Sequence, residues 1–174
     1  MQYKISTAYI ETPLGNMIAG VTDNGVCLLE FSDRELLGKE IQSISRSLDA
    51  EISDGESNHF RLLEKELIEY FKGTLKKFTV PVVMTGTDFQ NSVWKTLLKI
   101  PYGKTWSYKQ EAEKLGRPKS VRAVANANGQ NRISIIIPCH RVIGSNGTLT
   151  GYGGGLWRKK WLLEHEAKHN NPRK

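Results

Sequence analysis

The sequence predicts an α/β protein of the α+β type, with a small N-terminal β-sheet domain that carries a helix. A mostly helical C-terminal domain with a helix-turn-helix and one short strand follows. Three observations support this fold class. The first 31 residues alternate between apolar stretches and turn signals, later apolar residues recur at helical spacing, and the charge changes along the chain. Residues 1–86 carry 9 Lys/Arg and 13 Asp/Glu, whereas residues 87–174 carry 16 Lys/Arg and 5 Asp/Glu.

The composition excludes several classes of protein. With 174 residues, 39% hydrophobic and 25% charged, the chain can form one domain or two small ones and is not a disordered polymer. No apolar run is long enough to cross a bilayer, and the N-terminus does not resemble a signal peptide. Two cysteines, Cys27 and Cys139, cannot form a disulfide framework. We therefore expect a cytoplasmic protein with no membrane contact.

The first domain is predicted from four consecutive segments. Residues 3–31 form a β-hairpin or meander, because Asp23-Asn24-Gly25 separates two apolar stretches. The polar residues 39–58 are read as a frayed helix followed by a surface loop. A helix follows from Phe60, with apolar residues at helical spacing, and ends at Gly73. We expect a last strand over Phe78–Val83.

The second domain is predicted to begin at residue 87, which divides the chain into 1–86 and 87–174. Apolar residues from Phe89 to Leu98 share one helix face. The next helix begins with the capping-box spacing of Ser107 and Gln110 and runs to Gly116. A turn and a further short helix, Val121–Asn128, complete a helix-turn-helix pattern.

Three segments complete this domain. A buried strand is expected over Ile133–Ile137, because this run is apolar and β-branched and ends at Pro138. A glycine-rich loop covers Gly144–Gly155, and the last helix spans about Leu156–Ala167.

The clearest chemical signal is Cys139, which follows Pro138 and precedes His140 and Arg141. An ordinary thiol has a pKa near 8.5, and a neighbouring base or positive charge increases its thiolate fraction. His140 and Arg141 could each have this effect, directly or through a water. The alternative is an inert buried cysteine, which is the usual state of a lone cysteine and the interpretation we adopt for Cys27.

Other chemistries find less support in the sequence. The cysteines and the four histidines show no paired metal-ligand spacing, so we expect no metal site. No Walker or dinucleotide-binding glycine pattern occurs. The basic C-terminal half favours a polyanion partner contacted by one part of the chain, although a solvated basic face would have the same composition.

The segment Ile137-Pro138-Cys139-His140-Arg141-Val142-Ile143-Gly144 resembles the active-site signature of the methylated-DNA–protein-cysteine methyltransferases, which repair 6-O-alkylguanine in DNA. The likeness extends over the chain. It includes Thr12-Pro13-Leu14-Gly15, Phe89-Gln90-Asn91-Ser92-Val93-Trp94, Ser107-Tyr108, Val121-Arg122-Ala123-Val124, Asn131, Gly151-Tyr152 and Trp161-Leu162-Leu163-Glu164-His165-Glu166.

This resemblance implies catalytic roles. Cys139 would be the nucleophile and permanent alkyl acceptor, with His140 as its base through a bridging water and Glu166 orienting His140. Tyr108 would bond the flipped guanine and help to protonate it as it leaves. No cofactor is implied. The protein would be a single-turnover methyltransferase acting on 6-O-alkylguanine and, by the same likeness, on 4-O-alkylthymine.

The resemblance also implies how substrate and DNA are held. Val142, Tyr152 and Gly153 would shape the guanine pocket, and Asn131 would tie the recognition helix to the active-site strand. Arg122 would fill the gap left by the flipped nucleotide, because an alkyl group inside the stack is reached only by base flipping. The remaining expected DNA contacts are Ala123, Ser120, Asn128 and Gln90. The partner would be double-stranded DNA, bound by a monomer and, in a prokaryote, at the nucleoid.

Two alternative functions and three departures from the family pattern accompany this interpretation. The same helices could serve a non-catalytic binder of damaged DNA, although such relatives lack the cysteine. A Cys–His pair could also serve a hydrolase that turns over without DNA. The N-terminal domain lacks the zinc ligands of some members, Arg132 and Ser134 replace prolines, and residues 168–174 have no clear counterpart.

Overall fold

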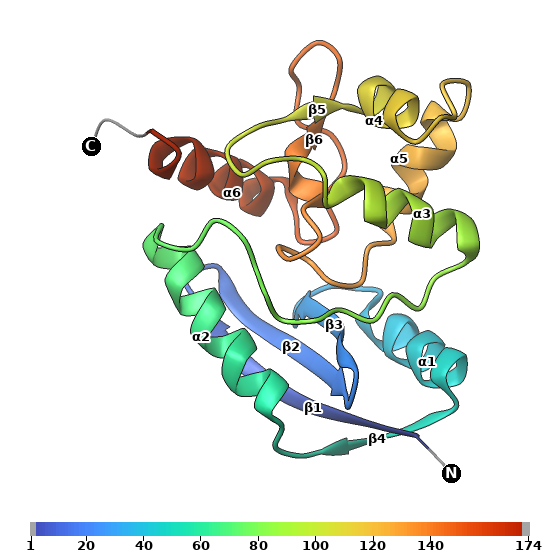
Figure 1. Ribbon diagram of the computed structural model, residues 1–174, viewed down its shortest axis with the longest axis vertical. Helices are drawn as coiled ribbons and strands as arrows, with labels where there is room; N and C mark the ends of the chain where they lie inside the picture. The colour runs from blue at the N-terminus through green and yellow to red at the C-terminus, as the bar shows by residue number, and fades with distance from the viewer. Residues whose placement is uncertain (1–2, 172–174) are drawn as a thin grey trace. The chain divides into compact units, whose positions relative to one another are not determined.

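The computed structural model describes residues 3–171 and confirms the predicted fold class: a small sheet domain with helices and a mostly helical domain (Figure 1). The chain divides into two compact units, one up to Thr85 and the other from Gly86. This division lies one residue from the expected boundary. None of the helices in the described part of the chain is long and apolar enough to span a bilayer.

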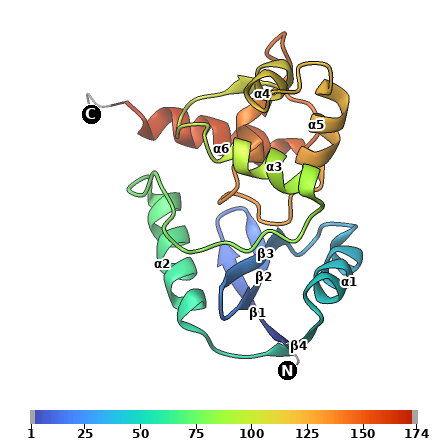
Figure 2. The same ribbon diagram turned by 45° about the vertical axis from the view of Figure 1, so that its right-hand side comes forward.

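The first unit is built on a four-stranded sheet with the order β3-β2-β1-β4. An antiparallel meander, β1 (Tyr3–Thr12), β2 (Gly15–Thr22) and β3 (Gly25–Phe31), forms three of its strands. This confirms the hairpins expected over residues 3–31. Two helices follow, α1 (Leu37–Leu48) and α2 (Asn58–Lys72), and Figure 2 shows them beside the sheet. Gly73 ends α2 with φ of 81°, as expected.

Two expectations for this unit were wrong. The polar stretch 39–58 is not a helix and loop alone, because it contains β4 (Ala50–Asp54), which pairs in parallel with β1. Residues 78–83 do not form a strand and make only an isolated bridge between Val82 and Val26. Pro81 has no N–H to donate to a ladder, although its carbonyl accepts from Val26 N at 2.8 Å.

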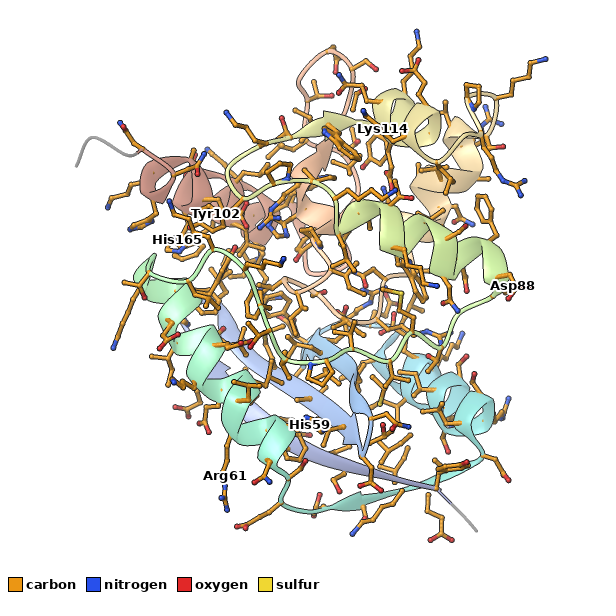
Figure 3. The ribbon with its side chains drawn as sticks, in the orientation of Figure 1. His59, Arg61, Asp88, Tyr102, Lys114 and His165 are labelled. Carbon is orange, nitrogen blue, oxygen red and sulfur yellow. The ribbon has the colours of Figure 1, made fainter. Side chains whose placement is uncertain are left out.

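The second unit has four helices of which two form the expected helix-turn-helix. Its elements begin with α3 (Asp88–Leu97), and Figure 3 shows Asp88 at the start of that helix. The strand β5 (Trp106–Ser107) leads into α4 (Tyr108–Lys114), and α5 (Val121–Gly129) follows after a turn. The capping box of Ser107 and Gln110 is confirmed at the start of α4. The unit ends with α6 (Leu156–His169).

The strand expected over Ile133–Ile137 is absent from the structure. Ile133 makes only an isolated bridge, residues 134–136 form a turn, and Ile135 has a φ of 72°, which is rare for a β-branched residue. The short strand of this unit is instead β6 (Val142–Ile143), which pairs in parallel with β5. Between the turns and β6, Cys139–Arg141 form a short 3-10 helix.

Candidate active site

Cys139 lies on the 3-10 helix rather than on a strand, and its side chain reaches the wall of a cavity. The residue is 9% exposed. The amide Nδ2 of Asn131 donates to the sulfur at 3.3 Å. Asn131 thus places a hydrogen-bond donor at the sulfur. Cys139 is therefore buried, but it is open to the cavity on one side.

Asn131 replaces the strand partner that residues 133–137 lack. Its Nδ2 donates to the carbonyl of Ile137 at 2.9 Å, and its Oδ1 accepts from the backbone N–H of Ile133 at 3.0 Å. The side chain is 1% exposed. One buried amide thus fixes the turns that precede Cys139 and contacts the sulfur as well. Asn131 lies between the end of α5 and the Cys139 segment, and the segment that it holds is a series of turns rather than the expected active-site strand.

His140 and Glu166 form a buried pair behind Cys139. His140 Nε2 lies 2.7 Å from Glu166 Oε1, and the two residues are 0% and 1% exposed. Burial lowers the pKa of His140, against the opposing effect of the Glu166 charge. A neutral ring donates through Nε2 and leaves Nδ1 with a free lone pair. Among residues 3–171, Nδ1 is buried and has no hydrogen-bond partner.

Arg141 holds the same carboxylate from its other side. Its guanidinium donates from Nε to Glu166 Oε2 at 2.8 Å and from Nη2 to Oε1 at 3.0 Å. Burial opposes ionisation of Glu166, but the charges and hydrogen bonds of His140 and Arg141 hold its pKa well below the ordinary value. Glu166 is therefore a fixed negative charge at neutral pH. Arg141, expected as a charge beside the thiol, acts on Glu166 instead.

The cavity in front of Cys139 has a volume of about 610 Å³. Cys139 lines it together with residues from α4, α5 and the glycine-rich loop: Tyr108, Val121, Arg122, Ala125, Asn128, Gly129, Thr150, Gly151, Tyr152 and Gly153. Its size suits a nucleobase, since small-molecule pockets range from about 300 to 1,000 Å³. The structure thus brings Cys139, Tyr108, Tyr152 and Gly153 together around one space.

Tyr108 closes one side of this cavity. Its hydroxyl donates to the carbonyl of Thr150 at 2.9 Å. Burial is the main cause that raises the pKa of Tyr108, and the negative charges of Cys139 and Glu111 raise it further. The phenol therefore keeps its proton at neutral pH and can donate it.

Lys159 is the residue of this site that the sequence reasoning missed. It is fully buried, and its Nζ donates to the carbonyl of Thr150 at 2.9 Å. The ammonium also lies 5.8 Å from the centre of the Tyr108 ring. Burial lowers its pKa, while the Cys139 charge raises it. A signal existed in the sequence, because Lys159 lies two turns before Glu166, a predicted catalytic residue, on the same face of the last helix.

The other residues that the sequence predicted for substrate or DNA contact lie on α3, on or just before α5, and in β6. Arg122 and Ala123 are exposed on α5, and Ser120 precedes that helix. Val142 is fully buried in β6 and does not line the cavity. Gln90 and Asn128, which were expected to contact DNA, form hydrogen bonds with other side chains of the protein. Gln90 caps α3 and donates to Gln130 at 2.6 Å, and Asn128 is buried against Glu111 in the cavity wall.

Within residues 3–171, no three potential metal ligands of the His, Cys, Asp and Glu types come together. Cys27 lies in β3, where its thiol donates to the carbonyl of Gly20 at 3.4 Å. Burial raises the pKa of Cys27 to about 12. A raised pKa leaves little thiolate, the nucleophilic form, at neutral pH.

Comparison with known proteins identifies one family. Residues 88–168 match the family model described as the DNA-binding domain of 6-O-methylguanine DNA methyltransferase. A methylated-DNA–protein-cysteine methyltransferase of Methanosarcina barkeri is 44% identical over 162 residues, which is 92% of this chain and 96% of that protein. A protein of the same name from Shigella flexneri is 58% identical over 106 residues, which is 60% of this chain and 62% of the relative.

A solved structure resembles the whole chain. The crystal structure of Mycobacterium tuberculosis OGT in complex with DNA aligns with a TM-score of 0.79 at 38% identity. The alignment covers 97% of this chain and 94% of that one.

Proposed function

Because this chain belongs to the methylated-DNA–protein-cysteine methyltransferase family, as its resemblance suggested, we propose that it repairs DNA by moving an alkyl group from 6-O-alkylguanine to Cys139. One observation carries the assignment to Cys139. Its side chain lines a cavity large enough to admit a nucleobase, and the adjoining His140 on the same 3-10 helix pairs with Glu166 of α6. The reaction as proposed requires no cofactor.

The first step is deprotonation of the thiol. Neutral His140 has a free lone pair on Nδ1, and we infer that a water relays the Cys139 proton to that atom. The fixed charge of Glu166 then stabilises the imidazolium that forms. Asn131 stabilises the thiolate through its amide N–H.

The second step is an in-line displacement. The sulfur forms a bond to the alkyl carbon, and the bond between that carbon and guanine oxygen 6 breaks. The electron pair stays on the guanine, which accepts a proton from Tyr108 as it leaves. Lys159 lies beside the Tyr108 ring and helps to hold the charge that develops there. The product is a thioether, which water cannot cleave at this site, so each molecule acts once.

The substrate must be extruded from double-stranded DNA, because an alkylated base edge inside the stack is not accessible to a side chain. The helix pair α4 and α5 provides the docking surface. Lys114, labelled in Figure 3, Arg117, Lys119 and Arg122 are exposed there. These charges suit phosphate contacts that do not depend on sequence. We place the protein, as a monomer, in the cytoplasm and at the nucleoid if the source is prokaryotic, where free thiols such as Cys27 and Cys139 stay reduced.

Incubation with an oligonucleotide that contains 6-O-methylguanine should add one methyl group, on Cys139 alone. Intact-mass measurement followed by peptide mapping checks this result. Cys139→Ala should bind the same DNA and accept nothing, while Cys27→Ala should accept the methyl group normally. Methyl transfer to Cys27 would refute the assignment. Product beyond one equivalent would instead favour an enzyme that turns over, as a hydrolase does.

Arg122→Ala should slow transfer from duplex DNA by about tenfold or more, because unstacking a base costs a few kcal/mol that the inserted side chain offsets. Transfer from free 6-O-methylguanine base should change little, since a free base leaves no gap to fill. The matched control is Lys95→Ala, which removes an exposed charge from α3, outside the proposed docking surface. An equal loss on duplex and free base would show that Arg122 acts on Cys139 or on folding instead.

A further inference from the structure

A second buried carboxyl lies beside the cavity and has no part in the proposed reaction. Glu111 follows Tyr108 by one turn of α4 and is 0% exposed. Its Oε2 accepts a hydrogen bond of 2.6 Å from Nδ2 of Asn128 on α5. Asn128 is 6% exposed and lines the cavity. This pair therefore joins the two helices of the helix-turn-helix at the cavity wall.

Within residues 3–171, the hydrogen bond between Glu111 and Asn128 leaves one buried oxygen of each side chain without a partner. Glu111 Oε1 and Asn128 Oδ1 have no hydrogen-bond partner among the described residues. Each is an acceptor when Glu111 is ionised, so the two oxygens cannot bond to each other. A buried acceptor without a partner costs about 1–3 kcal/mol, and more when it carries charge. A proton on Glu111 Oε1 would turn that oxygen into a hydroxyl, which is the kind of donor that Asn128 Oδ1 lacks in the described part of the chain.

We propose that Glu111 holds a proton in the folded protein and forms a cyclic acid–amide pair with Asn128, which fixes α4 against α5 at the cavity wall. In this pair the carbonyl of the acid accepts from the amide N–H, and the acid O–H donates to the amide carbonyl. Glu111 is thus a positioning residue that acts through Asn128 and does not touch the reacting atoms.

The surroundings of Glu111 support the protonated form. Burial is the main cause that raises the pKa of Glu111 to about 7, and the Asn128 bond opposes it. The elements packed against α4 are α3, α5, β5 and β6. Their charged side chains, Asp88, Lys95 and Arg122, are all exposed, and none contributes to the Glu111 pKa shift. Tyr108 is the titratable neighbour whose pKa responds to the charge on Glu111.

The first test compares thermal unfolding of the wild type and Glu111→Gln from pH 4.5 to 8.5. Glutamine presents a carbonyl and an NH₂ group in the same places and keeps the cyclic pair closed at every pH. The folded protein holds the Glu111 proton over a pH range in which the unfolded chain has lost it, so this stabilisation declines as pH rises. The wild-type Tm should fall relative to the variant, by several degrees, up to about pH 7 and then remain level.

Glu113→Gln is the matched control, because Glu113 is exposed on the same helix. Its Tm should keep a constant difference from the wild type. A constant difference for Glu111→Gln as well would overturn the proposal. A second measurement needs no substitution: the chemical shift of the Glu111 carboxyl carbon is followed by NMR in the wild type as pH is changed. Titration near pH 7 supports the acid–amide pair, and titration near the ordinary value of a glutamate overturns it.

The expected effect of the Glu111–Asn128 pair on alkyl transfer rests on the proposed function. The ratio of the wild-type transfer rate to that of Glu111→Gln should decline by severalfold between pH 6.5 and 8.5, as the pair opens in the wild type only. A ratio that does not change with pH would show that Glu111 does not position the site. The unfolding and NMR measurements involve no alkyl transfer, so they distinguish failure of this inference from failure of the proposed function.

Discussion

Glu166→Gln should slow alkyl transfer by about two to four orders of magnitude, because a neutral amide no longer stabilises the imidazolium on His140. The change should also lower the free energy of unfolding by roughly 3 kcal/mol or more, since it leaves the buried guanidinium of Arg141 without its counter-charge. Single-turnover kinetics and thermal unfolding measure the two effects. Glu164→Gln, on an exposed position of the same helix, should alter neither.

The same variant should change the response to acid. The pKa of Glu166 is depressed in the folded protein, so its stabilising effect is present above the ordinary glutamate pKa and is lost as pH falls. The wild type should therefore lose Tm more steeply than Glu166→Gln below about pH 4.3. If the Tm of both proteins declined equally as pH falls below this value, Glu166 would not be the ionised, stabilising carboxylate that we propose.

Asn131→Ala should lower the free energy of unfolding by about 2–4 kcal/mol, because it leaves the N–H of Ile133 and the carbonyl of Ile137 buried without their partner. Transfer should also slow, since the sulfur of Cys139 loses its N–H donor. Chemical denaturation measures the first effect and single-turnover kinetics the second.

Asn126→Ala provides the comparison, because Asn126 is exposed on α5. It should stay within about 0.5 kcal/mol of the wild type. If Asn131→Ala is no less stable than Asn126→Ala, Asn131 does not organise the turns before Cys139.

Local signals in the sequence predicted the elements whose causes are local. The capping box of Ser107 and Gln110, the turn at Asp23–Gly25 and the glycine that ends α2 each depend on residues a few positions apart. The helix-turn-helix followed from the same kind of pattern.

The features that were missed depend on contacts between distant residues. Ile133–Ile137 has the composition of a strand, but the amide of Asn131 satisfies its backbone and permits a turn. β4 is short and polar, and only its pairing with β1 makes it a strand. A buried lysine such as Lys159 resembles a surface residue until its acceptors, the carbonyls of the glycine-rich loop, are known.

Because the two thiols differ in accessibility, the amount of reactive thiol in the native protein should measure the fraction of molecules that have not yet accepted an alkyl group. Cys27 is fully buried in the sheet with a pKa raised to about 12, so thiol reagents should not reach it in the folded state. Cys139 opens onto the cavity and loses its thiol when it accepts an alkyl group. The stoichiometry of labelling of the native protein would therefore fall from one towards zero as lesions are repaired, and a single titration of free thiol would report how much repair capacity a sample still holds.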